Sequence, residues 1–189
     1  MKNLKILAIA IISLTTFVSC NDDDNPVPVN EEEVITTVTT TLVTATNATI
    51  QTVILKSRDL DGDGPNAPVV TVSGTLKPNT VYTGTVSFLN EIANPVENIT
   101  EEVLEEGVNH QVFFEAPSAL GTFAYSDTDA NGKPIGLQFT FTTTVAATGN
   151  LLVTLRHELN KSAAGVSGGS ITNAGGNTDA AVTYAVVVQ

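Results

Sequence analysis

Alternation of apolar residues with threonine is the feature of this sequence that most constrains its fold. In residues 34–45, VITTVTTTLVTA, the apolar residues Val34, Val38 and Leu42 share one parity, and threonines fill most positions between them. Side chains of a β-strand alternate between its two faces, so this spacing predicts a strand with one face toward a core. Comparable segments follow at 49–57, 69–76, 81–91, 109–116, 135–143, 150–159 and 179–188.

The separation of these segments predicts the fold class. Clusters of Gly, Pro, Asn and Asp lie between them, and about eight short strands joined by such turns are typical of all-β domains. The sequence therefore predicts a single Ig-like or jelly-roll-type β-sandwich. The side chains expected to face inward include Val70, Val72, Leu76, Tyr82, Val86, Phe88, Ile135, Leu137, Phe139 and Phe141.

Two segments depart from the alternation. In NPVENITEEVLEEGVN, Thr100 is a candidate N-cap, the two glutamates after it suit the positive end of a helix dipole, and Gly107 would end the helix. We expect one short helix at about 100–106. Residues 161–179, KSAAGVSGGSITNAGGNTD, are small, polar and glycine-rich. They predict a long surface loop, and loops of that length are often functional.

Cys20 is the only cysteine in the chain, so it cannot form a disulfide within it. Lys2 and Lys5 precede the apolar run LAIAIISLTTFV, and small Ser19 stands before the cysteine. This order is typical of a secretory signal, and the run is shorter than the ~20 apolar residues that span a bilayer. The residues FVSC resemble the lipobox of bacterial lipoproteins. That resemblance implies cleavage before Cys20 and a lipid on its sulfur; a plain secreted protein or a buried thiol are the alternatives.

The segment after Cys20, NDDDNPVPVNEEE, holds six carboxylates and two prolines. It is too polar to order itself by burial and predicts a semi-rigid tether. We therefore expect a signal peptide at 1–19, a lipidated cysteine and acidic tether at 20–33, and the β-sandwich at 34–189. A cysteine followed by acids also resembles the export signal of surface-displayed lipoproteins of the Bacteroidota, with a plain spacer as the alternative. The expected location is the outer membrane, facing the cell surface or the periplasm.

The charge of the chain limits its partners. The formal net charge is −12, and it becomes −14 when the two lysines of the signal peptide are removed. Nucleic-acid binding needs a basic surface, which this composition does not supply. Anionic lipid would repel the chain, so we expect membrane attachment through the lipid alone. The motifs G-x-S-x-G, H-E-x-x-H and G-x-x-x-x-G-K-[ST] do not occur in the sequence, which favours a non-enzymatic protein.

Two loops carry oxygen-bearing side chains at alternate positions, in the patterns D-x-D-x-D-G and D-x-D-x-N-G. Calcium prefers six to eight oxygen ligands, and the first half of an EF-hand loop has this spacing. Position twelve, where an EF-hand has a bidentate glutamate, is Val70 in one loop and Gln138 in the other. Calcium would need further ligands from elsewhere, and ordinary hairpin turns are the alternative. The candidate calcium ligands are Asp59, Asp61, Asp63, Asp127, Asp129 and Asn131.

Two histidines continue the apolar faces of their predicted strands. His110 shares its parity with Val112 and Phe114, and His157 shares its parity with Val153 and other apolar residues. If their strands were neighbours, the two imidazoles could approach each other and bind a transition metal or a haem iron. The alternative is that each histidine is a polar strand end, because the sequence places no third ligand close by.

From RDLDGDGPNAPVVTVSGTL to LRHELNKSA and ITNAGG, the chain resembles small cell-envelope lipoproteins labelled type 1 periplasmic binding fold proteins. That label implies two α/β lobes with parallel sheets, whereas the alternation predicts antiparallel strands.

The sequence favours a non-enzymatic binding or accessory lipoprotein that works beside an outer-membrane uptake receptor or on an extracellular ligand. The alternatives are a calcium-stiffened structural or adhesion module, and a metal- or haem-binding protein that uses His110 and His157.

Overall fold

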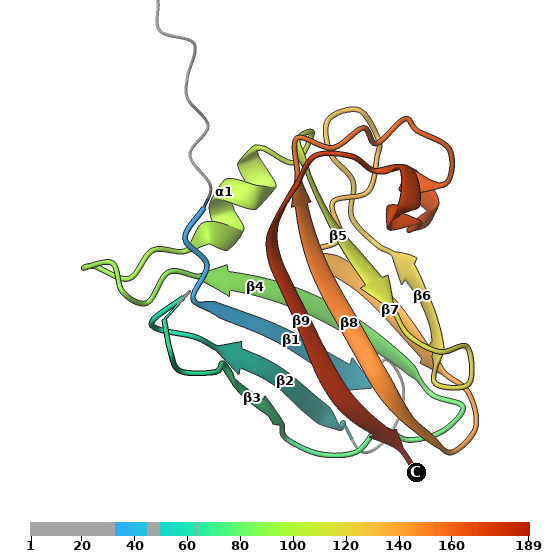
Figure 1. Cartoon of the computed structure of the whole chain (residues 1–189). Helices are drawn as coiled ribbons and strands as arrows, with labels where there is room; N and C mark the ends of the chain where they lie inside the picture. The colour runs from blue at the N-terminus through green and yellow to red at the C-terminus, as the bar shows by residue number, and fades with distance from the viewer. Residues whose placement is uncertain (1–32, 45–49, 63) are drawn as a thin grey trace, which may run out of the picture. The chain divides into compact units, whose positions relative to one another are not determined.

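The structure is a computed structural model that describes residues 33–44, 50–62 and 64–189 (Figure 1). The predicted signal peptide, Cys20 and all of the predicted tether except Glu33 lie outside the described residues, as does Asp63. Within the described part, no helix is both long and apolar enough to cross a membrane.

Two antiparallel sheets make up the domain. The larger sheet has the order β3-β2-β1-β4-β7-β6 and the smaller sheet has the order β5-β8-β9. In Figure 1, β8 and β9 cross in front of the larger sheet, and one core cluster joins side chains of both sheets. The all-β sandwich predicted from the alternation is therefore confirmed. The strands are β1 (Thr37–Thr44), β2 (Thr52–Arg58), β3 (Val69–Val72), β4 (Val81–Leu89), β5 (His110–Glu115), β6 (Gly121–Tyr125), β7 (Gln138–Thr143), β8 (Ala147–His157) and β9 (Asn177–Val188).

Most predicted inward positions are buried. Those of β4, β7 and the segment before β7 are at most 7% exposed. The prediction is wrong for Val70, which is 43% exposed, because β3 is a four-residue strand at the edge of the larger sheet. Leu76 is buried outside any strand, through a bridge to Val188. Burial at a sheet edge depends on what covers the strand, which alternation does not report.

Two buried tyrosines form hydrogen bonds through their hydroxyl groups inside this core. The Tyr184 hydroxyl on β9 donates to the carbonyl oxygen of Val38 on β1, at 3.2 Å, and so links the two sheets. The Tyr82 hydroxyl donates to the Gln51 side chain at 2.9 Å and accepts from the main-chain N–H of Lys77 at 2.8 Å. Buried hydroxyls cost free energy unless they are hydrogen-bonded, so these contacts let two aromatic rings enter the core.

The single predicted helix is confirmed as α1 (Ile99–Glu105), which connects β4 of the larger sheet to β5 of the smaller one. Its N-cap is Asn98, so the predicted cap at Thr100 is wrong. The Thr100 hydroxyl instead accepts from the N–H of Phe88 at 2.8 Å and donates to the carbonyl of the same residue at 3.1 Å. The side chain is used to attach the first turn of the helix to β4.

The glycine-rich segment is more ordered than a plain surface loop. It contains two short 3-10 helices, η1 (Val166–Gly168) and η2 (Ile171–Asn173), and β9 already begins at Asn177. Val166 and Ala174 are fully buried and pack with Phe113 and Leu159 in a second, smaller core. Phe113 and Phe114 are successive residues of β5, so the strand buries side chains on both faces.

Candidate functional site

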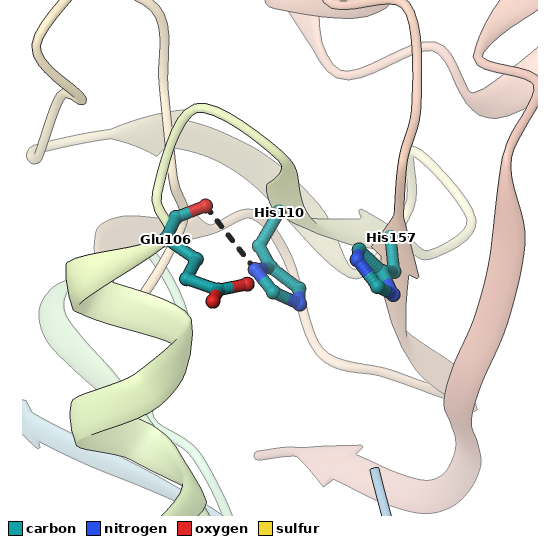
Figure 2. A group of neighbouring side chains, drawn as sticks. All are labelled: Glu106, His110 and His157. Atoms are coloured by element: carbon teal, nitrogen blue, oxygen red, sulfur yellow. Dashed lines mark hydrogen bonds between the residues drawn. The ribbon is translucent and has the colours of Figure 1, made fainter. Parts of the chain in front are cut away.

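The two histidines lie opposite each other in neighbouring strands. His110 begins β5, His157 ends β8, and the two are direct partners in the antiparallel register. Their rings stack with centroids 4.5 Å apart and planes 14° apart, and both side chains are at most 5% exposed (Figure 2). The two strands are neighbours and the imidazoles approach each other, while the binding of a transition metal or a haem iron by His110 and His157 stays a prediction.

Three carboxylates surround the stacked rings. An oxygen of Glu33 lies 3.2 Å from Nε2 of His110, and an oxygen of Asp179 lies 4.0 Å from Nδ1 of His157. The side chains of Glu33 and Asp179 are 8% and 0% exposed. Glu106, at the end of α1, is more exposed, and its carbonyl oxygen lies 3.2 Å from Nδ1 of His110 (Figure 2). We call the two histidines with Glu33, Glu106 and Asp179 the histidine cluster.

Asp179 reaches the histidine cluster because of a β-bulge. Leu155 and Arg156 of β8 face Ala180 and Thr178 of β9, so the register passes over Asp179. A bulge inserts one extra residue and turns its side chain to a new direction. The buried residues farther along β9, such as Tyr184, have even numbers, and only this irregularity explains why odd-numbered Asp179 has a buried side chain.

Negative charge dominates the electrostatics of the cluster. Burial lowers the pKa of His110, but the Glu33 carboxylate, the Glu106 carbonyl and the charge of Asp179 outweigh burial, and the pKa is raised. The pKa of Glu102 on α1 is also raised, by burial and then by the charges of Glu33 and other glutamates. A cation is therefore favoured at this end of the sandwich.

The first aspartate loop is held by its own hydrogen bonds. One Asp59 oxygen accepts from the N–H groups of Asp61 and Gly62, at 3.2 and 3.0 Å. One Asp61 oxygen accepts from the main-chain and side-chain nitrogens of Asn66, at 3.1 and 2.7 Å, and these bonds lower the pKa of Asp61. Such bonds are typical of turns. Calcium binding at Asp59 and Asp61 stays a prediction, and the third expected ligand, Asp63, is outside the described residues.

In the second aspartate loop a lysine supplies a cation. Asp127 accepts from the N–H groups of Gly136 and Gln138, at 2.8 and 2.9 Å. Asp129 accepts from the N–H groups of Asn131 and Lys133, at 2.8 and 2.9 Å, and from Nζ of Lys161 at 2.9 Å. Calcium at Asp127, Asp129 and Asn131 also stays a prediction, and such an ion would compete with the lysine for Asp129.

Lys161 is almost fully buried, with a side chain 5% exposed. Its ammonium also donates to the carbonyl oxygens of Pro134, at 2.8 Å, and Gly107, so all three of its donors have acceptors. Burial lowers the pKa of Lys161, against the raising effect of Asp129. Burial would raise the pKa of Asp129, but its hydrogen bonds from Lys133, Lys161 and Asn131 lower it overall.

A groove opens between the two sheets, where neither β5 nor β6 has a second neighbouring strand. It has a volume of about 740 Å³. Sequence reasoning missed it, because β6 (GTFAY) is short and begins with a glycine, and it was not recognised as a strand. Its walls include Phe114, Phe123, Tyr125, Ser167, Gly168 and Gly169. We call it the β5–β6 groove.

The aromatic wall of the groove belongs to a packed cluster. The ring centroids of Phe114 and Phe123 are 5.1 Å apart, and those of Phe123 and Phe141 are 4.4 Å apart. The Tyr125 hydroxyl donates to the carbonyl of Val112 at 2.8 Å and accepts from the Gln111 side chain at 3.1 Å. Burial raises the pKa of Tyr125 to about 12, so the hydroxyl stays protonated at neutral pH. These contacts hold the wall in place before any ligand arrives.

Comparison with known proteins leaves the function to be argued from this geometry. No protein-family model matches the chain, no curated protein matches it, and no solved structure matches it.

Proposed function

We propose that this chain is a non-enzymatic binding lipoprotein of the cell envelope, and that it binds a small, largely uncharged molecule in the β5–β6 groove. The signal-like start and the FVSC motif at Cys20 support the envelope location and the lipid anchor. An outer-membrane receptor that takes up the same molecule is the expected partner. The groove is the observation that carries the binding function.

The size and lining of the groove fit a small ligand. Sites for small molecules are clefts of about 300–1,000 Å³ with apolar and aromatic walls and a few polar groups. The β5–β6 groove has about 740 Å³ and three aromatic residues in its walls. Among the described residues that line it, Glu115 is the only charged one. A ligand with apolar faces and little charge therefore suits the groove.

The free edge of β6 supplies the polar groups. The carbonyl of Leu120, just before β6, accepts from Thr144, and the N–H of Ser126, just after it, donates to Gln138. Backbone groups of an antiparallel strand point alternately to its two sides, so the even-numbered residues bond to β7. The N–H and carbonyl of Phe123 consequently point away from β7, toward the groove. A ligand could exchange hydrogen bonds with this edge while it packs on the Phe123 ring.

Titration with the neutral fluorescent dye Nile red tests the proposal. We expect saturable binding by the parent protein and about tenfold weaker binding by Phe123→Ala, since an aromatic contact and its buried area are lost. Gly168→Trp should block the groove without straining the chain. Its φ is not in the left-handed region, and a Cβ there meets no atom within 4 Å.

Val69→Ala is the matched control, because Val69 is 65% exposed and lies on β3, at the opposite edge of the larger sheet from β6. It should bind the dye like the parent. Equal affinity of the parent, Phe123→Ala and Gly168→Trp would show that the groove is not the binding site.

A further inference from the structure

The histidine cluster has the composition of a transition-metal site, independent of the β5–β6 groove. We propose that His110, with the carboxylates of Glu33 and Asp179, binds a divalent ion of the zinc type, and that His157 holds the His110 ring in place by stacking on it. The four side chains come from the segment before β1, from β5, from β8 and from β9, so the site exists only in the folded domain. Two sets of three ligand atoms, each with all atoms within 4.8 Å of one another, share His110: Glu33, His110 and Asp179, and Glu106, His110 and His157.

The closest separation in the cluster matches that of two ligands on one ion. Zinc lies about 2.0–2.2 Å from a histidine nitrogen or a carboxylate oxygen, so two ligands at a tetrahedral angle are about 3.3 Å apart. Nε2 of His110 and the nearer oxygen of Glu33 are 3.2 Å apart. The second Glu33 oxygen is buried and has no hydrogen-bond partner among the described residues, and Nε2 of His110 faces the nearer Glu33 oxygen. These buried polar atoms remain available to a ligand.

The other nitrogen of His110 fixes the ring for this role. Nδ1 lies 3.2 Å from the carbonyl oxygen of Glu106, and a carbonyl can only accept, so this contact is a hydrogen bond when Nδ1 carries the proton (Figure 2). In the neutral ring, Nε2 then points its lone pair toward Glu33. Metal-binding histidines nearly always donate their other N–H to a carbonyl or a carboxylate.

The charge and the donor types select the ion. Two neutral imidazoles and two ionised carboxylates carry a charge of about −2 in a buried place, which a divalent cation neutralises. Calcium and magnesium prefer oxygen ligands alone, whereas imidazole suits zinc, copper and nickel. The two imidazoles stack with planes 14° apart, so neither a haem between them nor one ion shared by both rings fits, and His110 is the histidine ligand.

A surface cavity adjoins one residue of the cluster. Asp179 lines a surface cavity of about 230 Å³ that Asp59 and Ile35 also line. Asp59 belongs to the first aspartate loop, so a second acidic residue lines this cavity. A cleft with charges of one sign raises the local concentration of ions of the opposite sign.

Nuclear magnetic resonance of the histidine rings tests the site directly, because the chain has only two histidines. The protein is isolated without a histidine tag and titrated with Zn²⁺. We expect the His110 ring to respond through binding and the stacked His157 ring to respond less, with an end point at one ion per chain and no response to Mg²⁺. Rings that stay unchanged at a tenfold excess of Zn²⁺ would overturn the proposal, whatever the variants below do.

Variants of the carboxylates then test the ligand set. Glu33→Gln and Asp179→Asn should each weaken zinc binding at least tenfold, while the matched control Glu105→Gln should stay within twofold of the parent. Glu105 is exposed on α1, next to Glu106, and belongs to neither set of candidate ligands. Equal affinity of Glu33→Gln, Asp179→Asn and Glu105→Gln would show that zinc binds elsewhere.

Discussion

The ammonium of Lys161 and the carboxylate of Asp129 form a buried ion pair, with 2.9 Å between nitrogen and oxygen. The pair lies inside a loop whose D-x-D-x-N-G pattern predicts calcium from sequence alone. The pattern suggests that a metal ion supplies the positive charge beside Asp129. In the structure this charge comes from Lys161, which is 32 positions away in the chain. Because the same ammonium also donates to the carbonyl oxygens of Gly107 and Pro134, it connects the loop to these two residues.

Replacing this lysine should destabilise the protein. Lys161→Met leaves Asp129 buried without its ion-pair partner, and the loss of one partner of a buried pair costs about 3 kcal/mol or more. Calcium should then restore more stability to the variant than to the parent, because the ion can take the place of the ammonium. Urea unfolding with and without millimolar calcium measures both effects. A variant as stable as the parent would contradict the structural role of the pair.

Calcium should act on the parent protein through the first aspartate loop. An ion at ten times its Kd stabilises the folded state by about 1.4 kcal/mol. For a chain of this size that corresponds to a rise in Tm of about 3–6 °C. We expect calcium to raise the Tm of the parent protein more than magnesium does. Asp61→Ala should remove most of this difference in Tm, since Lys161 already neutralises Asp129 in the other loop.

Thermal unfolding of the parent, Asp61→Ala and Asp129→Ala in each ion tests this expectation. If calcium and magnesium act equally in all three proteins, the effect is general screening of an acidic chain. The two loops would then be ordinary acidic turns.

Acid should weaken the contact between β2 and the end of β4 through Glu91. The pKa of Glu91 is lowered to about 2 by the hydrogen bond from Arg58, and then by that from Thr37. A group with a lowered folded-state pKa stabilises the fold above its unfolded pKa, about 4.3 for glutamate, and this stability is lost as the pH falls toward the folded value. The free energy of unfolding should therefore fall between these two pH values, and Glu91→Gln should flatten that part of the profile. Parallel profiles for parent and variant would refute this assignment.

We predict a lipid anchor at Cys20. If FVSC is a lipobox, Cys20→Ser should abolish metabolic labelling with a clickable fatty acid and release the protein from membranes. Val69→Ala, which keeps the signal-like segment and the cysteine and changes an exposed residue of β3, serves as a control for expression and export. Undiminished labelling of the Cys20→Ser protein would exclude a lipid at this residue.

Alternation was sufficient to predict the sandwich, because each long strand places its apolar residues at one parity. It failed at short edge strands, where β6 went unrecognised and Val70 of β3 proved exposed. An edge strand has one neighbour and partial cover, so its pattern is weaker than that of a central strand. The β5–β6 groove was missed for the same reason.

The histidine cluster shows a second limit of the sequence. Parity predicted that His110 and His157 share the core face, and their strands proved to be neighbours. Glu33 precedes the first strand and was assigned to the tether, while Asp179 has the parity of an outward residue and turns inward only through a bulge. The contact of Glu33 with a residue far along the chain and the bulge at Asp179 leave no periodic pattern in the sequence. Only the structure therefore shows that these two carboxylates lie at the histidines.

Native mass spectrometry of the full-length protein, extracted from the producing cells in mild detergent, tests the central claim most directly. The account predicts that the parent carries a small molecule in addition to its lipidated chain, and that Gly168→Trp, which blocks the β5–β6 groove, loses this mass. The control Val69→Ala should keep it. A parent that carries no more mass than its lipidated chain, or an equal extra mass on Gly168→Trp, would contradict a binding function in the groove.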